Sequence, residues 1–314
     1  MDPLPTHRLL VVDDISKAIL LVSNPSGKIV AEQPLPHGFS LVDITVNYDL
    51  NEAYLALAGN GGSGLLASFS LNTLVCSNEF AIPHPAQFTR LPTSHTFILA
   101  DPDGHLYLTS AAKEPIVLDK PDGAGCCVGL VATESLIYGV WEAIGGGVLG
   151  MFDITGHQLY KRFFGATPTN LIADQHGRLF IPFTISPFSG EGLVVLSCQA
   201  LDDFSNTIIT QCQHCSATAP VYPIHVVITA SGNTAYIANE EAGHINIVDL
   251  QARHTVGIIS LGQSVSRLGL LPGENFAIAS SNMFANLCLI DLVNKRLVAF
   301  TDERETLSPF AVIA

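Results

Sequence analysis

The stretch that decides the fold runs from Tyr222 to Gly262 and reads YPIHVVITASGNTAYIANEEAGHINIVDLQARHTVGIISLG. Four short apolar runs in it predict four strands, namely PIHVVIT, TAYIAN, HINIVDL and TVGIISL. The tetrads between them, Ala-Ser-Gly-Asn, Glu-Glu-Ala-Gly and Gln-Ala-Arg-His, include several residues that favour turns. One such unit buries only one side of a sheet, so it needs similar units beside it.

Imperfect copies of this unit run through the whole chain, and the second strand of each copy serves as a ruler. It recurs as LLVVDD (9–14), YLALAG (54–59), TFILAD (96–101), LIYGVW (136–141), LFIPFT (179–184), AYIANE (235–240) and FAIASS (276–281). The first residues lie 40 to 45 positions apart, except for one spacing of 56. This period, with four strands per unit, predicts an all-β fold, a seven-bladed β-propeller with four-stranded antiparallel blades.

The ends of the sequence predict how the propeller closes. The first unit lacks an inner strand, because MDPLPTH is short and rich in proline, whereas an apolar PFAVIA (309–314) follows the last unit. We therefore expect residues 309–314 to pair beside LLVVDD, which removes exposed sheet edges. A single domain over 1–314 follows, with blades at 309–314 plus 6–36, 40–83, 86–121, 125–165, 168–213, 222–262 and 265–302.

The composition narrows the classes of partner. Of the 314 residues 48% are hydrophobic and 13% are charged, and 28 acidic against 14 basic residues give a net charge of −14. A nucleic-acid backbone or an anionic membrane would be repelled, and no apolar run reaches the roughly 18 to 20 residues that span a bilayer. We expect a protein partner or a small-molecule ligand, with no nucleic acid and no membrane.

The seven cysteines and the N-terminal residues favour a cytoplasmic location. An odd number of irregularly spaced cysteines argues against a disulfide scaffold, and MDPLPTHRLLVVDD lacks the pattern of a signal peptide. The pair Cys212 and Cys215 forms a lone CxxC, which supplies two thiolates where structural zinc needs four ligands. Ordinary thiols are the favoured interpretation.

Two copies of the unit resemble a known repeat. VVITASGNTAYIAN (226–239) and LGLLPGENFAIASS (268–281) are similar to the YVTN-type repeat of seven-bladed propellers, V-x-P-D-G-x-x-x-Y-V-x-N. That family includes scaffold, surface and dehydrogenase-subunit proteins, so the resemblance implies a fold more than a function. PTNLIADQHGRLFIPF (168–183) weakly resembles phosphogluconolactonase-type propellers, but no catalytic motif of that activity is found.

Candidate functional residues lie where propeller loops converge, at the starts of first strands and just after second strands. The first set is Asp43, Gln87, Cys127, Asn170, His225 and Arg267. The second set is Asp13, Asp14, Asn60, Asp101, Asp103, Trp141, Glu142, Glu240 and Glu241. This end of the channel is the expected ligand face.

His225, Arg267 and Glu142 are the candidate catalytic residues. An imidazole near a guanidinium and carboxylates could hold an anion or transfer protons, and Asp43 could orient His225 across the channel. The alternative is that these side chains only hydrogen-bond channel waters and neighbouring loops. A cysteine nucleophile at Cys127 with His225 is a weaker hypothesis.

The candidate ligand-binding residues are Asp43, Asn170, Trp141, Asp101 and Glu240. The carboxylates of Asp14, Asp101, Glu142 and Glu240 recur at nearly one position in four units. With Asn170 they could take Ca²⁺ or another hard cation at the channel mouth. No motif requires a cofactor, and the identity of any metal stays open. The alternative is that the acidic side chains only solvate the loops. Trp141 could pack against a ligand or fill the core.

Two classes of function remain. The first is a binding or scaffold propeller that docks a partner protein or small ligand at the channel face. The alternative is a lactonase- or lyase-type enzyme, with or without a metal, acting at the channel mouth. Fold alone does not distinguish them, because propellers host both.

Overall fold

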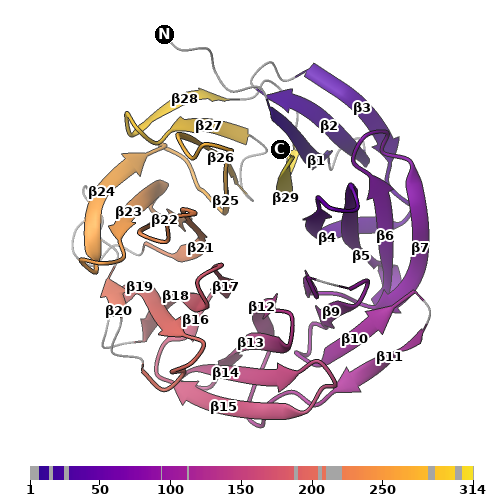
Figure 1. Ribbon diagram of the computed structural model, residues 1–314, viewed down its shortest axis with the longest axis horizontal. Helices are drawn as coiled ribbons and strands as arrows, with labels where there is room; N and C mark the ends of the chain where they lie inside the picture. The colour runs from indigo at the N-terminus through magenta and orange to yellow at the C-terminus, as the bar shows by residue number, and fades with distance from the viewer. Residues whose placement is uncertain are drawn as a thin grey trace. The chain divides into compact units, whose positions relative to one another are not determined.

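The computed structural model describes residues 7–13, 17–24, 28–92, 94–111, 113–186, 190–203, 207–209, 221–281, 287–300 and 306–313. These residues form seven antiparallel sheets and a single short 3-10 turn at Asn60–Gly62, without any α-helix among them. Each sheet is one blade, so the fold is the predicted seven-bladed β-propeller (Figure 1). The contacts divide the chain into two compact units, residues 1–85 with 263–314 and residues 86–262.

The first unit holds blades 1, 2 and 7. Blade 1 consists of β29 (Thr306–Ile313), β1 (His7–Asp13), β2 (Ala18–Asn24) and β3 (Lys28–Pro34). Blade 2 consists of β4 (Phe39–Asn47), β5 (Glu52–Gly59), β6 (Ser63–Ser70) and β7 (Cys76–Pro83). Blade 7 consists of β25 (Arg267–Leu270), β26 (Phe276–Ser280), β27 (Leu287–Asp291) and β28 (Arg296–Phe300).

The second unit holds blades 3 to 6. Blade 3 consists of β8 (Gln87–Arg90), β9 (Phe97–Ala100), β10 (Leu106–Ser110) and β11 (Lys113–Leu118). Blade 4 consists of β12 (Cys127–Ala132), β13 (Leu136–Ala143), β14 (Gly146–Asp153) and β15 (Gln158–Phe164). Blade 5 consists of β16 (Thr167–Pro168), β17 (Ile172–Ala173), β18 (Arg178–Ser186), β19 (Gly190–Ser197) and β20 (Thr207–Ile209). Blade 6 consists of β21 (Pro223–Ile228), β22 (Thr234–Asn239), β23 (His244–Asp249) and β24 (His254–Ser260).

The predicted closure of blade 1 is confirmed. Strand β29 pairs antiparallel with β1, with Ala311 opposite Leu10 and Ile313 opposite Arg8. It begins at Thr306 rather than at residue 309, and it contacts both β25 and β4. Figure 1 shows it between these two inner strands. The pairing satisfies the backbone groups on the inner edge of β1, which would otherwise be unpaired.

Blade 1 is buried on both faces, which explains its uninterrupted apolar sequence. Leu10 and Ile313 pack into a cluster with blade 2, whereas Leu9 and Phe310 pack into a cluster with blade 7. Successive strand residues point to opposite faces, so every position of such a strand has to be apolar. The run LLVV therefore forms a strand although it lacks the alternation of apolar and polar residues that is typical of a half-buried strand.

The first strands of most blades carry a β-bulge near their starting end. In blade 2 the register shifts between Leu41 and Asp43, and in blade 6 it shifts between Pro223 and His225. Two residues of the first strand then lie opposite one residue of the second strand. This extra residue changes the direction in which the next side chain points. We call this the bulge position. Pairing and backbone hydrogen bonds place six residues there: Asp43, Gln87, Gly129, Asn170, His225 and Arg267.

Candidate functional site

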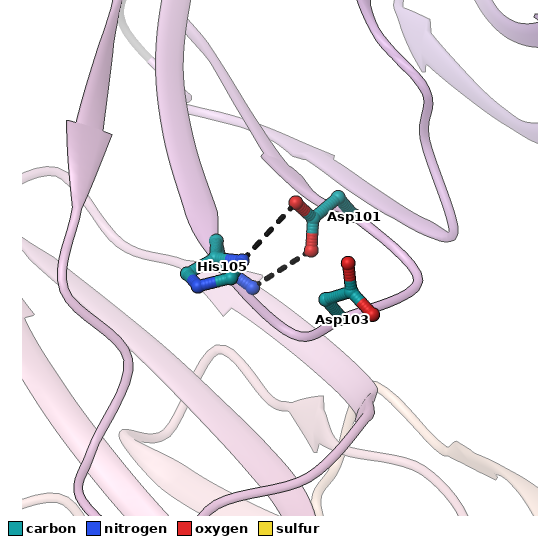
Figure 2. Close-up of side chains that lie close together, drawn as sticks. All are labelled: Asp101, Asp103 and His105. Atoms are coloured by element: carbon teal, nitrogen blue, oxygen red, sulfur yellow. Dashed lines mark hydrogen bonds and ion pairs between the residues drawn. The ribbon is translucent and has the colours of Figure 1, made fainter. Parts of the chain in front are cut away.

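The loop from Asp101 to His105, between β9 and β10, brings three potential metal ligands together. One ligand atom each from Asp101, Asp103 and His105 lies within 4.8 Å of the others (Figure 2). The Asp101 and His105 side chains are 15% and 43% exposed, and Asp103 is exposed. The sequence predicted ligand roles for Asp101 and placed Asp103 in the same loop, but it did not single out His105.

The Asp101 carboxylate is held in place by neighbouring groups. Its Oδ1 accepts the backbone N–H of His105 over 2.9 Å, and its Oδ2 accepts the Tyr107 hydroxyl over 2.9 Å. The His105 Nδ1 lies 3.3 Å from the same Oδ2. The pKa of Tyr107 is raised, first by burial and then by its hydrogen bond to Asp101. These contacts orient one carboxylate and the imidazole before any cation binds.

The loop rests on blade 4 through Gly104. The Trp141 Nε1–H donates to the Gly104 carbonyl over 2.8 Å, and Gly104 has φ +85°. A Cβ at this glycine would collide with the Gly125 carbonyl, so the turn needs both a left-handed conformation and close approach. Lys120 Nζ donates to the Asp103 carbonyl over 2.6 Å. The loop is therefore fixed from two sides.

Two other turns share the backbone hydrogen bonds of the Asp101–His105 loop. These shared hydrogen bonds therefore belong to a recurring type of turn and do not by themselves indicate a ligand site. In the turns 153–157 and 174–178 the first Asp carbonyl also accepts the N–H of the glycine, as in 101–105. The first Asp Oδ1 again accepts the N–H of the fifth residue, His157 or Arg178. Asp103 distinguishes the loop, because Thr155 and His176 occupy its place in the other two turns.

Trp141 belongs to the core. It is 0% exposed and its ring lies 6.2 Å from that of Phe152 in an edge-to-face arrangement, with an interplanar angle of 60°. The only polar hydrogen of its side chain, the indole N–H, is donated to the Gly104 carbonyl. Of the two roles that the sequence left open for Trp141, its position is that of a core side chain. Trp141 contacts the Asp101–His105 loop through its hydrogen bond to the Gly104 carbonyl.

The residues at the bulge position divide between the two units. In the first unit Arg267 Nη1 donates to Asp43 Oδ1 over 2.8 Å, and both side chains are 25% exposed. In the second unit Asn170 Nδ2 donates to the Ile224 carbonyl over 3.2 Å, which links blade 5 to blade 6. His225 lies partly buried on β21 of the second unit. The catalytic hypothesis thus draws on both units, since Arg267 lies in one and His225 and Glu142 lie in the other.

In blade 4 the bulge position holds Gly129 rather than Cys127. A Cβ on Gly129 would collide with the backbone N of Leu171, so blade 5 packs directly against this glycine. Cys127 precedes the bulge and is buried, and burial raises the pKa of its thiol to about 12. A thiol with that pKa carries almost no thiolate at neutral pH, which weakens the nucleophile hypothesis.

The backbone of Tyr222, a residue that the sequence did not single out, is hydrogen-bonded to two glutamates. Its carbonyl accepts the Glu240 N–H over 2.9 Å, and its own N–H donates to Glu191 Oε2 over 3.0 Å. The pKa of Tyr222 is raised by burial and then by the charges of Glu240, Glu142, Glu241 and Glu191. Asp14 of the predicted carboxylate set, Cys212 and Cys215 lie outside the described residues.

Comparisons with known proteins show the fold and nothing finer. The chain resembles a functionally unknown protein from Desulfotomaculum acetoxidans with a TM-score of 0.76 and 14% identity, over 98% of this chain and 99% of the other. It resembles apo AztD from Citrobacter koseri with a TM-score of 0.67 and 10% identity, over 98% and 99%. It also resembles the dihydro-heme d1 dehydrogenase NirN in complex with DHE with a TM-score of 0.63 and 13% identity, over 98% and 75%.

No family model matches the chain. No curated protein matches it either. The YVTN-type and phosphogluconolactonase-type resemblances therefore remain interpretations of the sequence. Within the part of the chain that the structure describes, no helix is long and apolar enough to cross a membrane.

Proposed function

We propose that this propeller is a binding protein that holds a divalent cation in the Asp101–His105 loop. The observation that carries the proposal is the convergence of two carboxylates and one imidazole within 4.8 Å. Mixed oxygen and nitrogen ligands suit Mn²⁺ or Zn²⁺ better than Ca²⁺, which prefers six to eight oxygen atoms. Ca²⁺, which the sequence analysis named as one possible cation, is therefore the weaker candidate at this loop.

The second observation that supports the cation site is that its ligands are already held in position by hydrogen bonds. Tyr107 and the His105 N–H hold the Asp101 carboxylate, while Trp141 holds the Gly104 carbonyl beneath it. Ligands that are already oriented lose less conformational entropy when a cation binds. A protein partner or small molecule, the partner expected from the sequence, could then reach the coordination positions that three protein ligands leave open. A cytoplasmic location remains part of this proposal.

The test is calorimetric titration with Mn²⁺ and with Zn²⁺ after treatment with a chelator. We expect one cation per chain, and we expect Asp103→Asn to weaken binding at least about tenfold because it removes one ligand. The matched control is His157→Asn, which changes the equivalent turn in which Thr155 replaces the second carboxylate, and it should leave binding unchanged. Equal affinity in Asp103→Asn and the unchanged protein would refute the cation site.

The alternative function is metal-assisted hydrolysis of a small lactone. Three protein ligands leave room for a water molecule, and a bound cation lowers the pKa of such a water. A simple γ-lactone, titrated with and without Mn²⁺, is the appropriate probe. Hydrolysis that requires the cation and Asp103 would favour an enzyme at this loop. Hydrolysis that is lost in His225→Ala or Glu142→Gln instead would favour the catalytic set expected from the sequence.

A further inference from the structure

Lys120, in the linker between β11 and β12, contacts the Asp101–His105 loop. Its Nζ donates to the Asp103 carbonyl over 2.6 Å, and Asp103 supplies one of the three potential metal ligands. The carbonyl and carboxylate oxygens of one aspartate are at most about 5 Å apart, so this ammonium lies within roughly 8 Å of the Asp103 carboxylate. Lys120 and the loop belong to the same compact unit, residues 86–262.

Lys120 forms no ion pair with any residue that the structure describes. The nearby Asp122 pairs instead with Lys161 over 3.2 Å. Lys120 is partly buried, and a lysine ammonium has three N–H donors, of which the Asp103 carbonyl takes one. Within the described part of the chain, the other two donors and the positive charge are therefore left for another group beside the cation site.

A divalent cation, its three ligands and Lys120 together carry one net positive charge. Asp101 and Asp103 neutralise the two charges of the cation, while His105 binds a metal as the neutral imidazole. The charge of Lys120 then remains. Three protein ligands also leave coordination positions open, and oxygen ligands bind both Mn²⁺ and Zn²⁺. A singly charged anion with two oxygens matches both the charge and the open positions, and a carboxylate is such a group.

We infer that a carboxylate group of a second molecule bridges the bound cation and Lys120. One carboxylate oxygen binds the cation, and the other accepts a charge-assisted hydrogen bond from the ammonium. Phosphate is the weaker candidate, because its charge at neutral pH exceeds the single charge to be balanced and the chain itself carries a net charge of −14. The inference rests on the proposed cation site and names the class of ligand that this site takes.

The test measures binding of acetate to the Mn²⁺-loaded protein, with protein in excess over Mn²⁺. Mn²⁺ is paramagnetic and speeds the relaxation of acetate methyl protons when acetate binds beside it, so an NMR titration gives the dissociation constant. Methylammonium, of similar size and opposite charge, is the control ligand. We expect acetate to bind at least about tenfold more tightly than methylammonium. Equal binding of the two, or displacement of acetate by an equal concentration of inorganic phosphate, would overturn the inference.

A second ligand distinguishes the two sources of a carboxylate. This ligand is a short peptide with blocked ends and a single glutamate, and its control peptide has glutamine in that place. Tighter binding of the glutamate peptide than of acetate would support the inference and assign the carboxylate to a protein side chain. Tighter binding of acetate would support it and assign the carboxylate to a small molecule.

Variants of Lys120 separate a ligand-binding role from a structural one. Lys120→Met should weaken acetate binding at least about tenfold and leave the Mn²⁺ affinity measured without acetate unchanged. Lys120→Arg keeps the charge and should hold acetate binding within about threefold. The matched control is Lys161→Met, which removes the same charge from a lysine that already pairs with Asp122, and it should leave acetate binding unchanged.

The outcomes distinguish a failure of this inference from a failure of the proposed function. If the unchanged protein binds no Mn²⁺, the cation site is refuted and the inference falls with it. If Mn²⁺ binds but Lys120→Met and the unchanged protein have equal affinity for acetate, only the bridging carboxylate is refuted. Loss of Mn²⁺ affinity in Lys120→Met would show that the ammonium holds the loop in place, and that result would also overturn the inference.

Discussion

Arg267 donates to Asp43 across the closing strand. The bond joins β25 of blade 7 to β4 of blade 2, and β29 contacts both of these strands. Tyr48, just after β4, donates its hydroxyl to the Val312 carbonyl of β29 over 2.6 Å. The strand that completes blade 1 is therefore held by its pairing with β1 and by one hydrogen bond from blade 2.

Breaking this ion pair should destabilise the first unit modestly. Arg267→Gln and Asp43→Asn should each lower the free energy of unfolding, with a coupling energy of about 0.5–1 kcal/mol, because partly exposed pairs are screened by solvent. A double-mutant cycle measured by urea unfolding gives this number. The control pair is Lys161 and Asp122, whose Asp122 side chain is fully exposed, and its coupling should be near zero. Equal coupling in the two pairs would contradict the proposed difference.

A methyl group at Gly269 should disturb the closing strand. A Cβ there would lie 2.9 Å from Phe310 Cε2 and 3.1 Å from Val312 Cγ2, both on β29. Gly269→Ala should therefore cost about 1–3 kcal/mol, as overpacking of a well-packed core does. Gly165→Ala is the control, since no atom lies within 4 Å of its Cβ position. The measurement is the shift in thermal midpoint of both variants, and similar shifts would argue against tight packing at β29.

Asp153 should contribute stability that is lost in acid. The Thr155 hydroxyl, followed by the backbone N–H groups of His157 and Thr155, lowers the pKa of Asp153 to about 2. A lowered folded-state pKa contributes stability that is present above the unfolded value near 3.8 and is lost as the pH falls through about 2. Thr155→Val should raise this pKa and flatten the pH dependence between those values. Carboxyl NMR titration measures it directly, and an unchanged pKa would disprove the assignment.

The fold could be predicted because the sequence patterns that indicate it, apolar runs and their regular spacing, do not depend on side-chain orientation. A strand buried on both faces, such as the one holding Leu9 and Leu10, reads as an apolar run whatever its partner is. The same holds for the closing strand with Phe310 and Ile313. The regular spacing of such runs then supplies the number of blades, because each blade repeats one supersecondary unit.

The candidate site could be predicted only in part, because it depends on pairing register and local turns. Alignment of the units placed Cys127 with Asp43, whereas the bulge places Gly129 there, and a single inserted residue is invisible without the paired strand. His105 was overlooked, although DPDGH, DITGH and DQHGR share an Asp-x-x-Gly spacing that signals one type of turn. Trp141 is buried because its side chain lies on the face of β13 that packs against blade 3. The spacing of the units does not specify which face of a strand a given side chain occupies.

The pairing of β29 with β1 imposes an order on folding. Of the strand pairs that the structure describes, this one is the most widely separated in sequence. Its contact therefore closes the largest loop, and such contacts form slowly. During synthesis, β1 to β3 are made before the other blades, and the inner edge of β1 stays unpaired until Thr306–Ile313 have been made. A molecular chaperone that shields this edge would keep it from pairing with a strand of another chain.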